Sequence, residues 1–246
     1  MPTNLYVAWQ NQATRAWHTV ARLSRTQTGY ELVFTRGVTS LLTIPSDLFR
    51  MDVRERYSSD ELFPLFKNRL LSRSRADFAK IARWLNVMGS EDEFDLLSKF
   101  GLIPGTDSLL VYPEPDVISG TYGLDFFVHG IRQMHKEARE LCGTLRIGQR
   151  LLPLLDVQNP VDPNAVAIRC VDQPVLVGYV PTFYSTDFRQ LLSQPRLAAK
   201  AQLTVVRFNE DAPDQLKLLC RFACAVPQGF RALNSEAHEP VTDEAA

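Results

Sequence analysis

The residues of this chain best suited to hold a ligand form one turn, Asn159-Pro160-Val161-Asp162-Pro163-Asn164. Asn and Asp side chains bond to the backbone of such turns and Pro fixes one φ angle, so the turn is rigid. A rigid turn can aim the Asp162 carboxylate and the Asn159 carboxamide outward, toward a small polar ligand. The same residue types also occur in turns that only connect two strands, and the sequence leaves that alternative open.

No other set of residues has the spacing of a catalytic or metal site. The four histidines are scattered, the four cysteines lack C-x-x-C spacing, and no Gly-x-Ser-x-Gly motif is present. Asp156 and Asp162 offer carboxylate oxygens of the kind that Mg²⁺ binds. Asp156, however, stands where a strand meets a turn, a position at which a lone Asp usually caps the turn. We therefore predict a binding protein with no catalytic residues, cofactor or metal.

The composition is that of an ordinary globular protein. Of 246 residues, 45% are hydrophobic and 22% are charged, and the net charge is −1. No apolar run approaches the roughly 20 residues of a membrane span, and the N-terminus lacks a signal-peptide pattern. Because the cysteines suggest no disulfide framework, we expect a reduced, cytoplasmic protein without a membrane partner.

One segment is strongly basic although the whole chain is not. It contains a single acid, Asp77, among the cations Lys67, Arg69, Arg73, Arg75, Lys80 and Arg83. Such a run can contact phosphates, which makes Arg69, Arg73, Arg75 and Lys80 candidate phosphate contacts. The more common explanation is the solvated face of a helix.

The elements that must position these residues predict an α+β protein. In the first half we expect strands at residues 5–10, 17–23, 30–35 and 109–112, which are rich in β-branched and aromatic residues. Between the third and fourth strands, apolar spacing predicts three helices. They cover residues 62–71, a segment capped by Ser74, and a segment capped by Ser90 that ends at Gly101.

The second half follows a linker rich in Pro and Gly at residues 113–121. Strands are expected at residues 165–171 and 175–180, on either side of a polar turn. Residues 227–246 are polar, with four acids and one base, and we expect them to be disordered. The predicted domains are therefore residues 1–112 and 122–226.

Three motifs of the second half resemble a HIRAN domain in order and spacing. They are FFVHGIR (residues 126–132), NPVDPNA (159–165) and VGYVP (177–181). The resemblance implies a small β-barrel, related in shape to OB and SH3-like folds, with short helices. HIRAN domains occur beside helicases and nucleases, and the DNA-binding ones hold the 3′ end of a single strand. This resemblance covers residues 122–226.

The resemblance also implies site residues. Arg132 matches the family's phosphate-binding arginine, and Asn159 and Asp162 match the turn that meets the 3′-hydroxyl. Tyr179 lies where a ring can contact a base or sugar. Gln133 and Met134 stand where DNA-binding members have two aromatics, Val161 stands where an aromatic can occur, and Thr182 stands where a lysine would add a phosphate contact.

The first half resembles, more weakly, the small N-terminal subdomain of HipA-type kinases. The resemblance rests on LYVAW (residues 5–9), LFKNRLL (65–71) and FDLLSKFG (94–101). In that family the subdomain precedes the kinase core or restrains the kinase as a separate chain. The kinase core has no counterpart here, and an unrelated α+β domain remains the alternative.

Two functions follow. The first is a nucleic-acid-binding module, for a DNA single-strand 3′ end or junction, that is accessory to DNA repair or processing. The second is a protein–protein regulator that docks on a HipA-type kinase or another enzyme, such as a helicase or nuclease. Phe63 and Phe66 are the candidate contacts for the second function, although core packing is their more common role.

Overall fold

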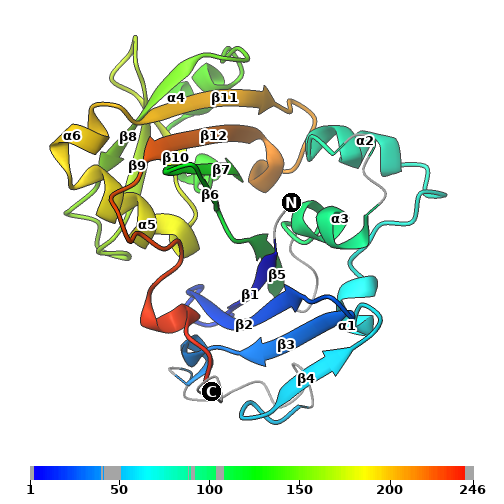
Figure 1. Ribbon diagram of the computed structural model, residues 1–246. Coiled ribbons are helices and arrows are strands. Elements are labelled where there is room, and N and C mark those ends of the chain that lie inside the picture. The colour runs from blue at the N-terminus through cyan, green and yellow to red at the C-terminus, as the bar shows by residue number, and fades with distance from the viewer. Residues whose placement is uncertain are drawn as a thin grey trace. The chain divides into compact units, whose positions relative to one another are not determined.

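The chain forms two compact units, and the second is inserted in the first. The computed structural model describes residues 3–39, 41, 51–87, 89, 92–103 and 108–241. The first unit comprises Met1–Glu114 and Asn234–Ala246, and the second comprises Pro115–Leu233 (Figure 1). Both units combine an antiparallel sheet with short helices, so the predicted α+β class is confirmed.

The first unit is built on a sheet of five antiparallel strands in the order β4-β3-β2-β1-β5. The strands are β1 (Asn4–Gln10), β2 (Trp17–Arg25), β3 (Tyr30–Phe34), β4 (Arg56–Ser59) and β5 (Leu109–Pro113). Four of them coincide with the predicted strands. The edge strand β4 was not predicted, because its sequence, Arg-Tyr-Ser-Ser, is short and polar.

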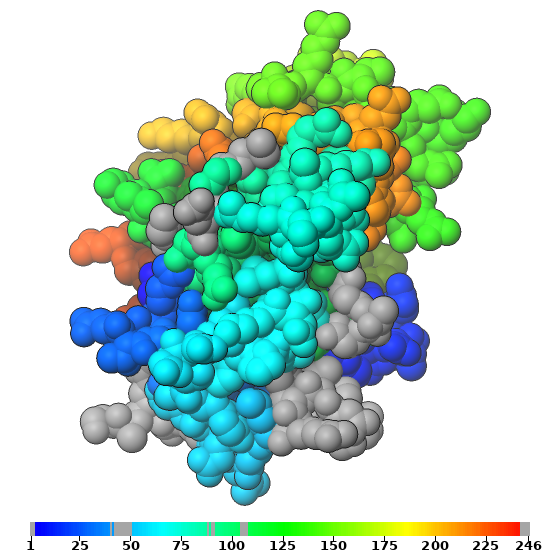
Figure 2. Space-filling view, turned by 90° about the vertical axis from the view of Figure 1, so that its right-hand side faces the viewer, coloured from blue at the N-terminus to red at the C-terminus, as the bar shows by residue number. Residues whose placement is uncertain are grey.

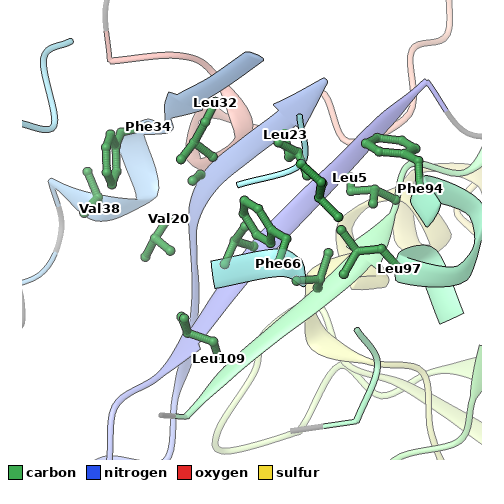
Figure 3. Close-up of a cluster of buried hydrophobic side chains, with 14 residues drawn as sticks. Leu5, Val20, Leu23, Leu32, Phe34, Val38, Phe66, Phe94, Leu97 and Leu109 are labelled. Atoms are coloured by element: carbon green, nitrogen blue, oxygen red, sulfur yellow. The ribbon is translucent and has the colours of Figure 1, made fainter. Parts of the chain in front are cut away.

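The first unit also contains the short helices α1 (Pro64–Lys67), α2 (Phe78–Trp84) and α3 (Glu93–Phe100), with a 3₁₀ turn η1 at Arg36–Val38. Helices α1 and α3 pack on one face of the sheet, and Phe78 of α2 contacts Phe100 of α3 with ring centroids 5.8 Å apart. Phe66 from α1 and Phe94 and Leu97 from α3 are fully buried against Leu5 and Leu23 of the strands (Figure 3). Burying each such side chain stabilises the unit by about 1.5–3 kcal/mol.

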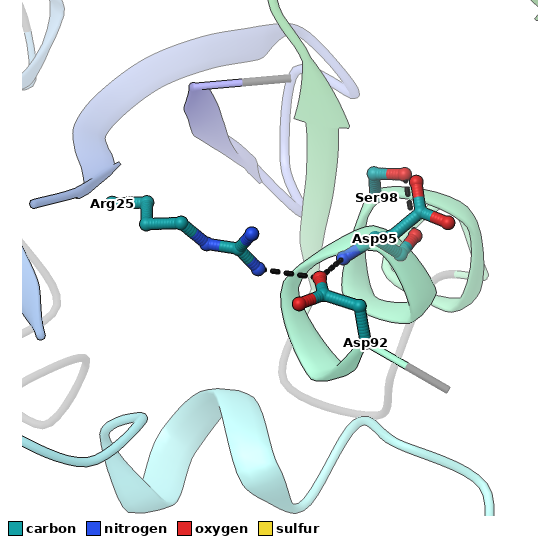
Figure 4. Close-up of polar contacts among 4 residues, drawn as sticks. All are labelled: Arg25, Asp92, Asp95 and Ser98. Carbon is teal, nitrogen blue, oxygen red and sulfur yellow. Dashed lines mark hydrogen bonds and ion pairs between the residues drawn. The ribbon is translucent and has the colours of Figure 1, made fainter. Parts of the chain in front are cut away.

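The helix caps differ from those predicted. Asp77, not Ser74, precedes α2, and its side chain makes no capping bond. Ser90 lies outside the described residues, and the N-cap of α3 is Asp92, whose Oδ1 accepts the Asp95 backbone N–H at 2.8 Å. Arg25 donates to the same oxygen, so this carboxylate joins β2 to α3 (Figure 4). Burial acts to raise the pKa of Asp92, but Arg25 and the backbone N–H groups hold it below its usual value.

The C-terminal segment covers the other face of the sheet. A 3₁₀ turn, η4 (Glu236–His238), buries His238 edge-on against Tyr6, and Pro240 pairs with Thr35. His238 Nε2 lies 3.0 Å from the Tyr112 hydroxyl, and Nδ1 lies 2.7 Å from Ser235 Oγ. Residues 227–241 are therefore not disordered as expected. The reason is that this polar segment contains His238, whose ring the sheet buries. Residues 242–246 lie outside the described residues.

The second unit is a single antiparallel sheet in the order β10-β9-β8-β11-β12-β7-β6. Its strands are β6 (Asp116–Ile118), β7 (Thr121–Phe127), β8 (Arg150–Leu155), β9 (Val166–Cys170), β10 (Leu176–Tyr179), β11 (Gln202–Phe208) and β12 (Leu218–Ala225). The strand β6 lies within the expected linker. The helices are α4 (Lys136–Cys142), α5 (Thr182–Leu192) and α6 (Pro195–Ala198), with 3₁₀ turns η2 (Ile131–Gln133) and η3 (Asp214–Leu216).

One bridge closes this sheet into a barrel. His129, two residues beyond β7, pairs with Tyr179 of β10, and each backbone N–H donates to the other's carbonyl at 2.9 and 2.8 Å. Gly178 allows the close approach. A Cβ at this position would lie 2.5 Å from the His129 carbonyl oxygen and 2.5 Å from Val128 Cγ1, and its φ is +148°. The closure therefore requires glycine.

The described residues lack two features, a membrane-spanning helix and a metal-binding cluster. None of the helices there is long and apolar enough to cross a membrane. The same residues contain no group of three or more His, Cys, Asp or Glu side chains placed to hold a metal ion.

Candidate nucleic-acid interface

The turn between β8 and β9 is held by its own side chains. Asn159 Oδ1 accepts the backbone N–H groups of Val161 and Asp162 at 3.0 and 3.1 Å. Asp162 Oδ1 accepts the N–H of Asn164 at 2.8 Å. These are the side-chain-to-backbone bonds for which Asn and Asp are favoured in turns. The turn is rigid, as its sequence predicts.

Tyr179 connects this turn to the barrel closure. Its backbone forms the bridge to His129, and its hydroxyl donates to Asp156 Oδ2 at 3.0 Å. The same oxygen accepts the side-chain amide of Asn159, also at 3.0 Å. Partial burial, and then the bond to Asp156, raise the pKa of Tyr179, so the phenol stays protonated and remains a donor.

Helix α5 holds the far end of the turn. Arg189 Nη1 donates to the carbonyl oxygen of Pro163 at 2.9 Å. The turn is thus fixed at its start by Asp156 and at its end by Arg189. Between these two points Val161 is 89% exposed, so the tip of the turn faces solvent.

Arg132 and Gln133 lie on η2, which begins two residues after His129 in the closing bridge. Gly130 precedes η2 with φ +76°, and a Cβ there would lie 3.5 Å from the Tyr179 ring. η2 therefore starts beside Tyr179. Arg132 is exposed, and within the described part of the chain its guanidinium forms no ion pair. Gln133 is also exposed.

Thr182 is the first residue of α5 and is exposed. Pro181 precedes it and provides no side-chain cap, so backbone N–H groups of the first turn have no capping side chain. Thr182 follows Tyr179 by three residues, at the end of the segment that leads from the barrel closure.

The structure therefore brings together five of the six residues predicted for the HIRAN-like site. Tyr179, Asn159 and Asp162 are joined through Asp156 or through the turn, and Arg132 and Gln133 follow Gly130 beside the Tyr179 ring. Within the described part of the chain, no hydrogen bond or ion pair joins the Thr182 side chain to them.

The four basic candidates of the first unit lie elsewhere. Figure 2 shows the surface formed by the segment from β4 to α2, in cyan, where these cations occur. Arg69 is half-buried and donates to the Leu109 carbonyl at 3.1 Å, and Arg75 forms two 2.9 Å bonds with Asp77. The Lys80 ammonium lies 5.0 Å from the centre of the Trp84 ring. Arg73 is exposed. Much of this positive charge is thus used within the chain.

Two residues of the site were missed by sequence reasoning. Asp156 was interpreted only as a turn cap or a magnesium ligand, and Arg189 was not considered. Their partners lie 23 and 26 residues away, Tyr179 for Asp156 and Pro163 for Arg189. Only the fold shows such pairs.

His129 contributes its backbone rather than its ring. The ring packs edge-on against Phe183, with centroids 6.0 Å apart, and burial lowers its pKa to about 4. The imidazole is therefore neutral at pH 7 and adds no positive charge to the site.

Comparison with known proteins agrees with the sequence resemblance. The family model of the HIRAN domain matches residues 122–226, which confirms the resemblance for this part of the chain. No curated protein matches the chain. The HipA-like resemblance of the first unit finds no support in any comparison.

Two solved structures are similar to the second half. One is a protein from Lactobacillus plantarum, with 17% identity and a TM-score of 0.33, covering 43% of this chain and 97% of that chain. The other is the HIRAN domain of human HLTF, with 14% identity and a TM-score of 0.34, covering 44% of this chain and 82% of that chain. TM-scores this low carry no argument about function.

Proposed function

We propose that the HIRAN-like unit binds nucleic acid, and specifically the 3′ end of a DNA single strand or a junction that presents one. The observation that carries the proposal is the combination of a rigid turn that carries Asp162 with an exposed Arg132 that forms no ion pair among the residues the structure describes. The protein then acts as an accessory to DNA-processing machinery. No catalytic role is proposed for the unit.

Each predicted residue has a role in this proposal. The Arg132 guanidinium pairs with a phosphate of the strand. Asp162 keeps Oδ2 outside the hydrogen bonds of the described residues, so this oxygen can accept a bond from a terminal 3′-hydroxyl. Its negative charge repels a terminal 3′-phosphate. Tyr179 supports a base or sugar, and Gln133 and Thr182 supply polar contacts on either side.

Stacking contributes little in this site. Gln133, Met134 and Val161 stand where the resemblance places aromatic rings, and stacking on an aromatic ring is worth about 1–3 kcal/mol per base. We therefore expect weaker binding than in a HIRAN domain that has those rings. Charge and end recognition then account for most of the affinity.

The test is fluorescence anisotropy with a short labelled strand ending in a 3′-hydroxyl. The same strand ending in a 3′-phosphate and a blunt duplex are measured beside it, at several salt concentrations. We expect the 3′-hydroxyl strand to bind most tightly, and Asp162→Ala to remove that preference. Equal, weak binding of all three DNAs by the wild type would refute the proposal.

Arg132 has a matched control in the same unit. Arg196 is exposed on α6, so Arg132→Ala and Arg196→Ala remove the same charge from different places. One lost phosphate contact should reduce the slope of log affinity against log salt by about 0.7 for a single strand. We expect this reduction for Arg132→Ala alone; a similar reduction in both variants would mean that only net charge matters.

No observation in the described structure supports the kinase-regulator function. Its candidate contact Phe66 is fully buried, and Phe63 is half-buried and packs against the same core. Both rings therefore have the core role that is more common for them.

A further inference from the structure

The carboxylate of Asp156 is a shared acceptor in the HIRAN-like unit. Its Oδ2 accepts the Tyr179 hydroxyl and the Asn159 amide, each at 3.0 Å. One of these donors comes from the turn and the other from the strand that closes the barrel. A single oxygen thus fixes the turn relative to the closure.

The hydrogen-bonding capacity of Asn159 is almost fully used within the turn. A carboxamide has one oxygen with two lone pairs and one nitrogen with two hydrogens. The oxygen accepts two backbone N–H groups, and one nitrogen hydrogen is donated to Asp156. At most one N–H is left for a ligand. Asp162, by contrast, uses one carboxylate oxygen for Asn164 and keeps the other.

We propose that Asp156 is a positioning residue, which holds Asn159 and Tyr179 so that Asp162 alone among the turn side chains reads the strand end. The inference rests on the proposed function and deepens it. Asn159 then affects the ligand through the conformation of the turn and not by direct contact.

Charge gives Asp156 a second effect. Among the described residues Asp156 forms no ion pair with a cation, so the turn carries two carboxylates within seven residues, Asp156 and Asp162. Like charges repel, and each carboxylate raises the cost of placing a phosphate at the turn. Asp156 therefore favours an uncharged strand end over a phosphorylated one without touching either.

The test compares four variants with a control. Asp156→Asn removes the charge and places two side-chain amides against each other. Asn159→Ala removes the bond to Asp156 together with the two bonds that Asn159 accepts from backbone N–H groups. The double variant combines the two changes. Asp172→Asn is the control, because Asp172 is an exposed acid in a different turn of the same unit, between β9 and β10. Tyr179→Phe is a milder variant that removes only the hydroxyl.

Amide hydrogen exchange measured by NMR is the first readout, and it needs no DNA. The N–H groups of Val161 and Asp162 donate to Asn159, so Asp156→Asn should speed their exchange about tenfold or more. The amides of the β12 ladder should not change. Tyr179→Phe should give a smaller effect, and Asp172→Asn none. Unchanged exchange of Val161 and Asp162 in Asp156→Asn overturns the inference.

DNA affinity is the second readout. Each single variant should weaken binding of the 3′-hydroxyl strand about tenfold, and Asp156→Asn should also reduce the preference over the 3′-phosphate strand. The double variant should bind more tightly than the product of the two single effects predicts, because both changes break the bond that Asp156 and Asn159 share. Fully multiplied effects in the double variant would show that the two residues act independently and would refute the positioning of Asn159 by Asp156.

The two readouts separate the two ideas. If the wild type binds none of the strands, the proposed function fails, and the reading role of Asp162 fails with it. The exchange result still decides whether Asp156 holds the turn.

Discussion

The substitution Gly178→Ala tests whether the barrel closes at one crowded point. A methyl group there would lie 2.5 Å from both the His129 carbonyl oxygen and Val128 Cγ1, and the backbone would keep φ +148°. A non-glycine residue in this region costs about 1–3 kcal/mol. Overpacking of a fitted contact costs about 1–3 kcal/mol more. The expected loss is about 2–6 kcal/mol, a large part of the roughly 5–15 kcal/mol that stabilises a typical domain.

A control separates the crowding from the backbone strain. Gly148 has φ +81°, and no atom lies within 4 Å of the position of its Cβ. Gly148→Ala should therefore cost only the conformational term of about 1–2 kcal/mol. The difference between the two variants measures the close approach of β10 to the end of β7.

The assay must report on the second unit. All three tryptophans, Trp9, Trp17 and Trp84, belong to the first unit, so their fluorescence does not follow the barrel directly. Urea unfolding should instead be followed by hydrogen exchange of the His129 and Tyr179 amides, which form the bridge. We expect both amides to lose protection in Gly178→Ala at a urea concentration where Gly148→Ala keeps it. Equal destabilisation by the two variants would refute the closure argument.

Three further predictions concern the rest of the chain. Asp92→Ala removes the N-cap of α3 and the partly exposed ion pair with Arg25, and it should lower the free energy of unfolding of the first unit by about 1–2 kcal/mol. Asp92→Asn keeps a capping oxygen and should cost less. Urea unfolding followed by tryptophan fluorescence measures both variants, and equal losses of stability would contradict the capping role. Burial lowers the pKa of His238 from 6.5 to about 4, so the unfolded chain binds this proton more readily and stability falls as the pH drops from about 6.5 to about 4. This difference in pKa between the unfolded and folded chain corresponds to at most about 3 kcal/mol of unfolding free energy. His238→Gln should therefore flatten the curve of stability against pH in this range, and an unchanged slope would show that other groups cause the loss of stability. The four cysteines are buried free thiols, and burial raises the pKa of each thiol, to about 11 for Cys142. A disulfide reagent should therefore label none of them in the native protein and all four in denaturant. Rapid labelling of the native protein would contradict their burial.

Local patterns in the sequence predict the strands well. Runs of β-branched and aromatic residues lie at β1, β2, β3 and β5, and the alternation around the turn predicts β9 and β10 within one or two residues. The sequence analysis assigns no range to β7, β8, β11 and β12, which follow only from the barrel that the resemblance implies. Two further strands that it does not predict, β4 and β6, are short edges without buried side chains. These two strands adopt an extended conformation because they pair with β3 and β7, and their own residue types do not determine it.

The site could be predicted only in part, for a similar reason. The turn residues Asn159 and Asp162 bond within three positions, so their sequence shows the bonds. The partners of Tyr179 depend on how the barrel closes, through Gly178 and the His129 bridge. Long-range partners of this kind follow from the register of several strands, which a single sequence does not reveal.

The insertion of the second unit affects how the protein is made. Synthesis proceeds from the N-terminus, so residues 234–241, which cover Tyr6 and Tyr112, leave the ribosome after all of Pro115–Leu233. At about 5–20 residues per second the first unit waits on the order of ten seconds without this segment. The barrel can therefore finish folding before the domain that begins the chain, which reverses the usual order. A released chain truncated after Leu233 would carry all strands of the barrel and a first unit with one sheet face still uncovered.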